Sequence, residues 1–389
     1  LPLAPIIIFF IISIYILLDI FYTILNSYAF TMKEKITFLG IETSCDETAA
    51  AVIRENEYGT ADILSNVISS QIDEHKKFGG VVPELAARAH LENIDFIINK
   101  ALKESKVSLK KIDGVAATAG PGLIVCLTVG LNIGKSIAAF SNKPFVGINH
   151  LEGHALSPGL ENKIEFPYLL LLISGGHTQY LIVKDVNNYE QLGTTIDDAL
   201  GEAFDKTAKM LNLGYPGGPR VEKFSKLGDK NYFKLPEPII NKAGCNLSFA
   251  GLKTAVLRET KKITTEKHRY NLAASFQNTV NKILYKKTEI AIKDFKEKTK
   301  TKKVKLIVAG GVAANISIRE NLSQLGKKLN FETIYPDLKF CGDNAAMIAW
   351  AGIQRFKRNL SSNFEIAARS RWQLDQNAPY MKGPGLDLK

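Results

Sequence analysis

The chain has 389 residues, of which 46% are hydrophobic and 23% charged, so it can build a sizeable core and divide into two lobes. Fifty basic against 39 acidic residues give a net charge of +11, which favours a polyanionic partner, although many of these lysines are expected on ordinary solvated surface. Four scattered cysteines without a C-x-x-C pair argue against a disulfide-rich secreted scaffold and indicate a reducing, cytoplasmic location.

The first 31 residues are almost wholly apolar, with Asp19 as their only charge. A secretory signal would begin with basic residues, yet the first basic residue here is Lys33. Met32 stands just before the first expected strand. We therefore expect residues 1–31 to lie outside the functional domain, upstream of a natural start, and expect no stable membrane partner; a membrane anchor is the alternative.

Alternating apolar runs and glycine-rich turns predict an α/β arrangement in the first part of the chain. The expected elements are strands at 36–41 and 49–53, a helix at 84–104, a strand at 113–119, a helix up to residue 140 and a strand at 144–148. The polar turn 42–48 joins the first two strands into a hairpin whose tip can hold a phosphate or fill an ordinary turn. The G-x-x-x-G-K-S run at 130–136 is one residue short of a P-loop and lies inside a helix, so we discount it.

The same pattern begins again after residue 158. A strand at 168–173, the turn 174–178 and a strand at 179–183 repeat the first hairpin. Paired hairpins predict a duplicated, two-lobed α/β architecture with a central cleft and one phosphate-facing loop per lobe. The two glycines of the second turn allow backbone amides to approach an anion, although a plain hairpin turn explains them equally well.

Further along, acidic and glycine-rich segments alternate. Asp198, Glu202 and Asp205 stand near helical spacing, and the Gly/Pro-rich loop 213–219 follows. A lysine-rich helix at 282–303 precedes a strand at 304–309, a double glycine and Asn315. Strand, double glycine and helix are typical of a nucleotide site at the carboxyl end of a sheet, whereas the absence of G-x-G-x-x-G argues against a dinucleotide site.

Two histidines four residues apart are the strongest candidates for metal ligands. If their segment is helical, His150 and His154 project from one face and can grip a transition metal, with Asp343 as a distant third ligand. Each has a simpler explanation. The histidines can lie on a helix surface without a metal, and Asp343 can serve as the N-cap of the apolar helix that follows it.

The motifs taken together resemble the tRNA adenosine threonylcarbamoyltransferase family, the bacterial TsaD proteins, formerly called O-sialoglycoprotein endopeptidases. The resemblance covers residues 36–353 and leaves out residues 1–31. It rests on segments that occur in this order: 39–48, the His150/His154 pair, 172–178, 201–206, 215–219, 246–252, 309–312 and 343–347.

The resemblance implies a fold of the actin and sugar-kinase type, with an N-terminal lobe at 32–150 and a C-terminal lobe at 151–389 that holds the nucleotide site and returns a C-terminal helix to the cleft. It implies transfer of threonylcarbamoyl from threonylcarbamoyl-adenylate to the exocyclic amine of the adenosine 3′ of the anticodon, in tRNAs reading codons that begin with adenine, with release of AMP. It also implies partners: tRNA, an inactive TsaB-like paralogue and a small TsaE-like ATPase.

The same resemblance assigns residues to the site. One iron(II) or zinc ion would be held by His150, His154 and Asp343. The adenylate would be bound by Leu172, Ile173, Ser174, Gly175, Gly176, Asp205, Gly218 and Asn315. No catalytic residue beyond the metal site is expected, because the adenylate is already activated and positioning can supply most of the rate.

Three other functions stay open on the sequence. An ATP-dependent small-molecule kinase or ATPase of the same fold would use the same hairpins, but it would need magnesium on phosphate rather than histidine ligands. A metalloendopeptidase would require H-E-x-x-H, whereas Leu151 follows His150 here. A tRNA-binding scaffold without catalysis is the third, and for RNA contact Arg369, Arg371 and Trp372 are candidates near the chain end.

Overall fold

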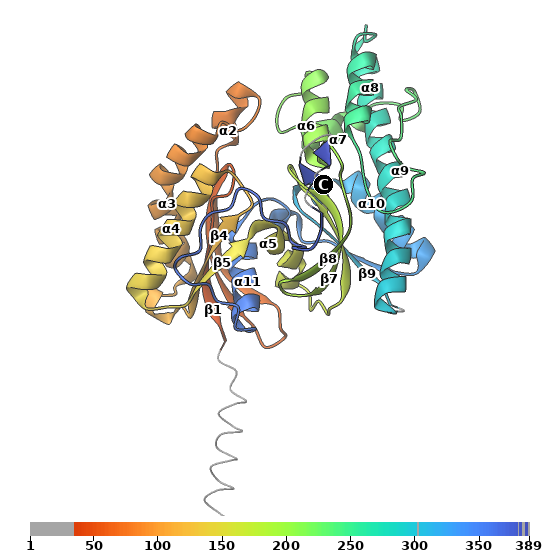
Figure 1. The fold of residues 1–389 in the computed structure, drawn as a ribbon. Helices are drawn as coiled ribbons and strands as arrows, with labels where there is room; N and C mark the ends of the chain where they lie inside the picture. The colour runs from red at the N-terminus through yellow and green to blue at the C-terminus, as the bar shows by residue number, and fades with distance from the viewer. Residues whose placement is uncertain (1–34, 302, 380, 383–385, 388–389) are drawn as a thin grey trace, which may run out of the picture. The chain divides into compact units, whose positions relative to one another are not determined.

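The computed structural model describes residues 35–301, 303–379, 381–382 and 386–387 (Figure 1). Residues Thr37–Lys389 form one compact unit, and the fold below is that of this unit. The prediction made for residues 1–31 falls outside the described part of the chain.

The first five-stranded sheet contains both members of the first predicted hairpin. Its order is β3-β2-β1-β4-β5, with antiparallel pairing from β1 to β3 and parallel pairing of β1, β4 and β5. The bounds are β1 Thr37–Glu42, β2 Glu47–Glu55, β3 Ala61–Ser70, β4 Gly114–Gly120 and β5 Phe145–Asn149. β1, β4 and β5 are buried along their whole length, as expected for parallel strands covered on both faces.

Alternate residues of β1 face different helices. Leu39 and Ile41 join the core made with α3 (Pro83–Ser105) and α4 (Ile124–Ser141). Phe38 and Gly40 face α11 (Ala345–Phe356) on the other side, where a Cβ on Gly40 would stand 2.4 Å from the carbonyl oxygen of Ala345. Glycine is therefore required at position 40, because the helix backbone runs directly against the strand.

The second sheet repeats the order of the first. It reads β10-β9-β6-β7-β8, with β6, β7 and β8 antiparallel and β9 and β10 parallel to β6. The bounds are β6 Tyr168–Ile173, β7 Thr178–Asp185, β8 Asn188–Thr194, β9 Lys305–Ala309 and β10 Glu332–Ile334. The predicted duplicated, two-lobed α/β architecture is confirmed, since each sheet pairs a three-strand meander with two parallel strands.

Helices cover both faces of the second sheet as well. One face packs into the largest core, which draws on α6 (Leu200–Met210), α7 (Gly217–Ser225), α8 (Ala250–Thr260), α9 (Glu266–Thr299) and α10 (Ile316–Leu329). The other face packs on α5 (His150–Leu156) and on Leu374 of the C-terminal segment. α5 also contacts α11, so these two short helices join the sheets between which they lie.

Three strands of the two large sheets, β3, β8 and the short β10, and part of a helix were not predicted. β3 and β8 carry mixed polar sequences with irregular burial, which gave no clear alternation. α9 begins at Glu266, well before the predicted start at Lys282. Within the described part of the chain one helix, α4, is long and apolar enough to cross a membrane by length and composition; it packs against β4.

Candidate functional site

The two histidines lie on one short, fully buried helix. Asn149 caps α5 by accepting a hydrogen bond from the backbone nitrogen of Leu151 at 2.9 Å, so the helix starts at His150 directly after β5. The imidazoles of His150 and His154 follow one turn apart, with ring centroids separated by 4.8 Å at an angle of 88°. The predicted helical spacing is confirmed, and the interpretation of the pair as surface residues is wrong.

Asp343 comes to this helix from the far end of the sequence. Its Oδ1 lies 3.3 Å from Nε2 of His150 and 3.0 Å from Nε2 of His154. The cap of α11 is Asn344, which accepts from the backbone nitrogen of Met347 at 3.0 Å. The N-cap explanation for Asp343 is therefore wrong, and its carboxylate is free to face the imidazoles.

The donor set of this cluster fits a divalent transition metal. His150, His154 and Asp343 each offer one ligand atom, and these atoms lie within 4.8 Å of one another. Two imidazoles and one carboxylate with open positions are a set used by catalytic zinc and by non-haem iron(II). Nδ1 of His154 is buried and has no hydrogen-bond partner among the described residues. The position of the His154 imidazole is therefore held only through its Nε2, which faces Asp343.

Glu42 supports His150 from the opposite side. Its Oε2 lies 3.0 Å from Nδ1 of His150, and Thr118 donates to the same oxygen at 2.6 Å. A carboxylate on Nδ1 fixes the ring and leaves Nε2 to face Asp343, which is the usual support of a metal-binding histidine. The sequence placed Glu42 in a polar turn without a role, because nothing local connects it to residue 150.

Charges within the cluster shift the protonation of its members. Burial lowers the pKa of His150, but the carboxylates of Asp343 and Glu42 outweigh burial and hold it well above the ordinary value. Burial alone would raise the pKa of Asp343, but the two imidazoles hold it below its ordinary value. The carboxylate is therefore ionised, and cation binding would displace the proton of His150.

A cavity of about 510 Å³ adjoins the cluster and is reached by Asp343. Its walls come from the β1–β2 turn, the β6–β7 turn, α6, α7 and the start of α10. Of the predicted adenylate-binding residues, the structure brings four to this cavity, namely Gly175, Asp205, Gly218 and Asn315.

The remaining predicted residues lie in or beside β6. Leu172 and Ile173 are fully buried in the strand, so their side chains do not face the cavity. Ser174 accepts a hydrogen bond from the backbone nitrogen of His177 at 3.1 Å and so shapes the turn. Gly176 lines a second, smaller cavity on the other side of that turn.

Close packing fixes the turn between the two cavities. A Cβ on Gly201, in the first turn of α6, would stand 2.7 Å from the carbonyl oxygen of Ser174 and 2.7 Å from Cα of Gly175. Asp205 on the same helix accepts from the backbone nitrogen of Gly217 at 2.8 Å. α6 therefore positions both glycine-containing walls of the larger cavity.

Two acidic residues of the first hairpin, whose tip was predicted to face a phosphate, reach this cavity, although neither was named as a site residue. Asp46 and Glu47, from the β1–β2 turn, line it opposite the second-lobe residues. Burial, Asp343 and Asp46 raise the pKa of Glu47 to about 9. The polar turn was visible in the sequence, but its position across the cavity depends on the packing of the two lobes.

Comparison with known proteins identifies the family. Residues 62–350 match the family described as TsaD, tRNA N6-adenosine threonylcarbamoyltransferase. A protein of that name from Pelagibacter ubique (strain HTCC1062) is 58% identical over 357 residues, which cover 92% of this chain and 100% of the relative. The chain belongs to the TsaD family. A second relative of the same name, from Bartonella tribocorum (strain CIP 105476 / IBS 506), is 51% identical over 355 residues, covering 89% and 98% of the two chains.

Two solved structures resemble the fold of this TsaD-family chain. Full-length HypF in a phosphate- and nucleotide-bound form has a TM-score of 0.53 at 13% identity, covering 84% of this chain and 47% of its own. HypF of T. kodakarensis has a TM-score of 0.56 at 13% identity, covering 83% and 48%. The chain spans about half the length of these HypF proteins, and the likeness shows the fold alone.

The geometry of α5 argues against the peptidase alternative within the TsaD family. Glu152 is the acidic residue between the two histidines, but it is 1% exposed and its Oε1 accepts from Nε of Arg355 at 2.9 Å. Its other oxygen accepts from the hydroxyl of Tyr189 at 2.9 Å. A carboxylate bound in this way is not available as the general base that a metallopeptidase needs.

Proposed function

We propose that the chain transfers the threonylcarbamoyl group from threonylcarbamoyl-adenylate to the exocyclic amine of the adenosine 3′ of the anticodon, in tRNAs that read codons beginning with adenine. The chain is a tRNA N6-adenosine threonylcarbamoyltransferase, since it is 58% identical to a relative of that name along that relative's whole length. The observation that carries the finer proposal is the placement of His150, His154 and Asp343 beside a nucleotide-sized cavity.

The metal would be held by the Nε2 atoms of His150 and His154 and by the carboxylate of Asp343. The donor set suits iron(II) or zinc, and the two are not distinguished by it. When bound, the ion supplies Lewis acidity and a template for the oxygens of the adenylate. Because α5 and α11 lie between the two sheets, the ligands hold the two lobes in register at the cavity.

The adenylate would lie in the cavity of about 510 Å³ between the β1–β2 turn and α6, α7 and α10. A Cβ on Gly218 would meet no atom within 4 Å, so the ligand can approach that backbone closely. Asn315 caps α10 by accepting from the nitrogen of Ile318 at 3.0 Å, and the start of this helix favours a nearby phosphate. Asp205 would orient a ribose hydroxyl; the role of Leu172 to Gly176 would come through the backbone of the β6–β7 turn.

The transfer itself needs no protein nucleophile. The amine nitrogen of the adenosine forms a bond to the carbamoyl carbon, the bond from that carbon to the phosphate oxygen breaks, and AMP leaves with the electron pair. The amine loses one proton to the solvent. The chain contributes by holding the amine and the mixed anhydride at reacting distance, which accounts for a large part of such rate enhancements.

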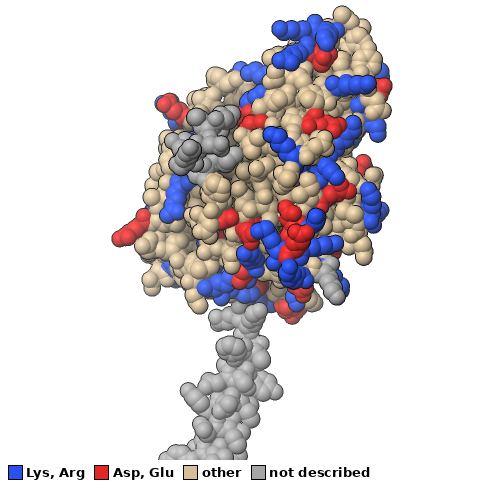
Figure 2. Space-filling view, turned by 45° about the vertical axis from the view of Figure 1, so that its right-hand side comes forward, with Lys and Arg blue, Asp and Glu red and all other residues tan. Residues whose placement is uncertain are grey.

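Surface features support the proposed partners. Figure 2 shows basic side chains gathered at the top of one face, where Figure 1 places the end of α8, and mixed with acidic ones below. Exposed Arg258, Lys261 and Lys262 at that end offer contacts for tRNA phosphates.

A second surface, on α3 and α4, exposes large apolar side chains. The exposed fractions are 63% for Leu91, 62% for Phe96 and 89% for Phe140, and these side chains would pack against a TsaB-like paralogue. We also propose that a small TsaE-like ATPase is a partner and that the chain works in the cytoplasm. The proposed boundary between the two lobes is at residue 150.

Mass spectrometry of nucleosides tests the proposed reaction. The purified chain is incubated with tRNA, threonylcarbamoyl-adenylate and iron(II) or zinc, together with the proposed TsaB-like and TsaE-like partners. Threonylcarbamoyladenosine should appear in the tRNA digest together with an equal amount of AMP. If the wild-type chain instead transferred the γ-phosphate of ATP to a small molecule and left tRNA unmodified, the kinase alternative would replace the proposal.

A further inference from the structure

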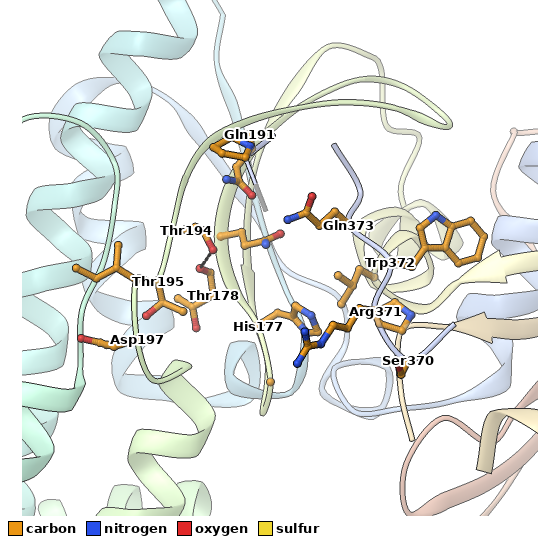
Figure 3. A pocket seen from close by; sticks show the side chains of 16 residues that line it. His177, Thr178, Gln191, Thr194, Thr195, Asp197, Ser370, Arg371, Trp372 and Gln373 are labelled. Atoms are coloured by element: carbon orange, nitrogen blue, oxygen red, sulfur yellow. Dashed lines mark hydrogen bonds between the residues drawn. The ribbon is translucent and has the colours of Figure 1, made fainter. Parts of the chain in front are cut away.

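A second cavity of about 240 Å³ lies on the other side of the β6–β7 turn (Figure 3). Two of its residues directly follow residues of the proposed site in sequence, since Gly176 follows Gly175 and Leu151 follows His150. One turn of the chain therefore separates it from the larger cavity. Its volume is below the roughly 300–1,000 Å³ of pockets for drug-sized ligands, which suits a single base rather than a whole nucleotide.

Three side-chain amides belong to the polar lining, beside four hydroxyl groups. Gln179 on β7, Gln191 on β8 and Gln373 on the C-terminal segment all face this cavity. Gln179 is 8% exposed, yet no side-chain hydrogen bond is formed by any of the three amides within the described residues. None of these amide atoms is closed off from solvent, so a ligand in the cavity that supplies one donor and one acceptor can hydrogen-bond to them.

The acidic residue in the lining is already occupied. Asp197 accepts from the hydroxyl of Ser248 at 2.5 Å and from the backbone nitrogens of Phe249 and Ala250 at 2.7 and 3.2 Å. Its carboxylate therefore fixes the start of α8 and is not offered to the cavity. In Figure 3 the side chain of Arg371 points toward His177, which brings a positive charge to the edge of the lining.

The C-terminal wall of the cavity is fastened to both lobes. The nitrogen of Arg369 donates to the carbonyl of Ala119 at 2.7 Å, and the amide of Asn149 donates to the carbonyl of Trp372 at 3.0 Å. On the other side the nitrogen of Gln191 donates to Asp375 at 2.8 Å. The wall is therefore preorganised. Its position is fixed by residues of β4 and β5, and β5 runs directly into the helix that carries His150 and His154.

We propose that this cavity receives one unpaired purine base of the RNA substrate, the acceptor adenine, and that the Gln179 amide reads its edge. This inference rests on the proposed function. A side-chain amide matches adenine through a hydrogen bond from N6 to its carbonyl and one from its NH₂ to N7. Leu151 and Pro121 add apolar surface for the base, and unpaired RNA bases are typically recognised in this way.

Binding of two synthetic anticodon stem-loop RNAs to the full chain tests the inference. One carries adenine at the acceptor position and the other carries purine, which lacks the 6-amino group. The wild type should bind the adenine RNA about tenfold more tightly. Gln179→Leu should bind both RNAs equally, at the weaker level, while its KM for threonylcarbamoyl-adenylate stays unchanged. Gln324→Leu, an exposed glutamine on α10, is the matched control and should keep the tenfold preference.

Each outcome decides between a base pocket and a structural role. If Gln179→Leu folds by circular dichroism and keeps the adenine preference, the inference is overturned. If it does not fold, Gln191→Leu is tested instead, since Gln191 is a half-buried residue of the same lining. This variant should lose the preference for the adenine RNA, and a retained preference would count against the pocket. If the wild type forms threonylcarbamoyladenosine but does not distinguish the RNAs, only the pocket fails. If it distinguishes them but forms no product, the proposed reaction fails and an RNA-binding pocket stands.

Discussion

Nε of Arg355 donates to Oε1 of Glu152 across 2.9 Å, and this ion pair joins the helix of the two histidines to the helix that follows Asp343. Both side chains are almost fully buried, at 9% and 1% exposure. Arg355 also donates to Oδ1 of Asn187 at 2.7 Å, so the β7–β8 turn is part of the same network. The geometry of the metal ligands therefore depends on a charge pair that none of them contacts directly.

The first prediction concerns this pair. Arg355→Met leaves the Glu152 carboxylate buried without its cation, so the free energy of unfolding should fall by about 3–5 kcal/mol in urea denaturation. Arg358→Met is the control, because its partner Asp185 is 48% exposed and the loss should stay below about 1 kcal/mol. Glu152→Gln combined with Arg355→Met should recover much of the loss. Equal losses in the two arginine variants would contradict the argument.

The second prediction concerns metal content and needs no activity assay. The purified chain should hold about one iron or zinc ion by elemental analysis, and His154→Ala or Asp343→Ala should remove most of it, because two ligands rarely retain an ion that three hold. His268→Ala is the control, since His268 lies on the first turn of α9 and its imidazole contacts Tyr232 and Thr264. Full metal content in both ligand variants would remove the cluster from consideration as a metal site.

The third prediction uses empty space beside a glycine. A methyl group added by Gly218→Ala meets no protein atom within 4 Å, and Gly218 lies in the first turn of α7, so stability should stay equal or rise by up to about 1 kcal/mol. If the adenylate lies against this backbone, its KM should rise about tenfold while the KM for tRNA stays constant. Gly80→Ala, which also meets no atom within 4 Å and lies outside the cavity, should leave both constants unchanged.

Much of the fold was predictable because strongly apolar segments dominate it. The runs at β1, β6 and β9 are almost wholly buried, and burial on both faces gives a continuous apolar sequence that can be recognised without a structure. β3 and β8 escaped because they lie outside the parallel core of their sheets, where polar side chains are tolerated. Their presence follows from pairing with β2 and β7, and pairing is not a local property of the sequence.

Only the local part of the metal site, the pair of histidines, could be placed from the sequence with its geometry. The spacing of His150 and His154 is local, so one helix was sufficient to place them together. Asp343 reaches them only because α11 returns to the first sheet and because Asn344 takes over the capping of that helix. The support of His150 by Glu42, across 108 positions of sequence, and the amides of the smaller cavity arise from packing alone.

The last prediction concerns pH and starts from a buried histidine behind the β1–β2 turn. Nε2 of His90 lies 3.0 Å from the carbonyl oxygen of Cys45, and its Nδ1 lies 2.7 Å from the hydroxyl of Thr48 and 3.3 Å from Nε2 of Gln71. A carbonyl can only accept and the amide nitrogen of Gln71 can only donate, so the ring is neutral with its proton on Nε2. Burial lowers the pKa of His90, in agreement with this arrangement.

Because the pKa of His90 is lower in the folded chain than its ordinary value of about 6.5, the unfolded chain binds more protons just below that pH. Stability should therefore fall as the pH drops from about 6.5 toward the folded pKa, by up to about 1.4 kcal/mol per pH unit from this group. Urea denaturation between pH 5 and 7.5 should show a smaller slope of the unfolding free energy against pH for His90→Gln than for the wild type. An unchanged slope in His90→Gln would mean that the imidazole protonates in the folded chain and that the turn carrying Asp46 and Glu47 tolerates the charge.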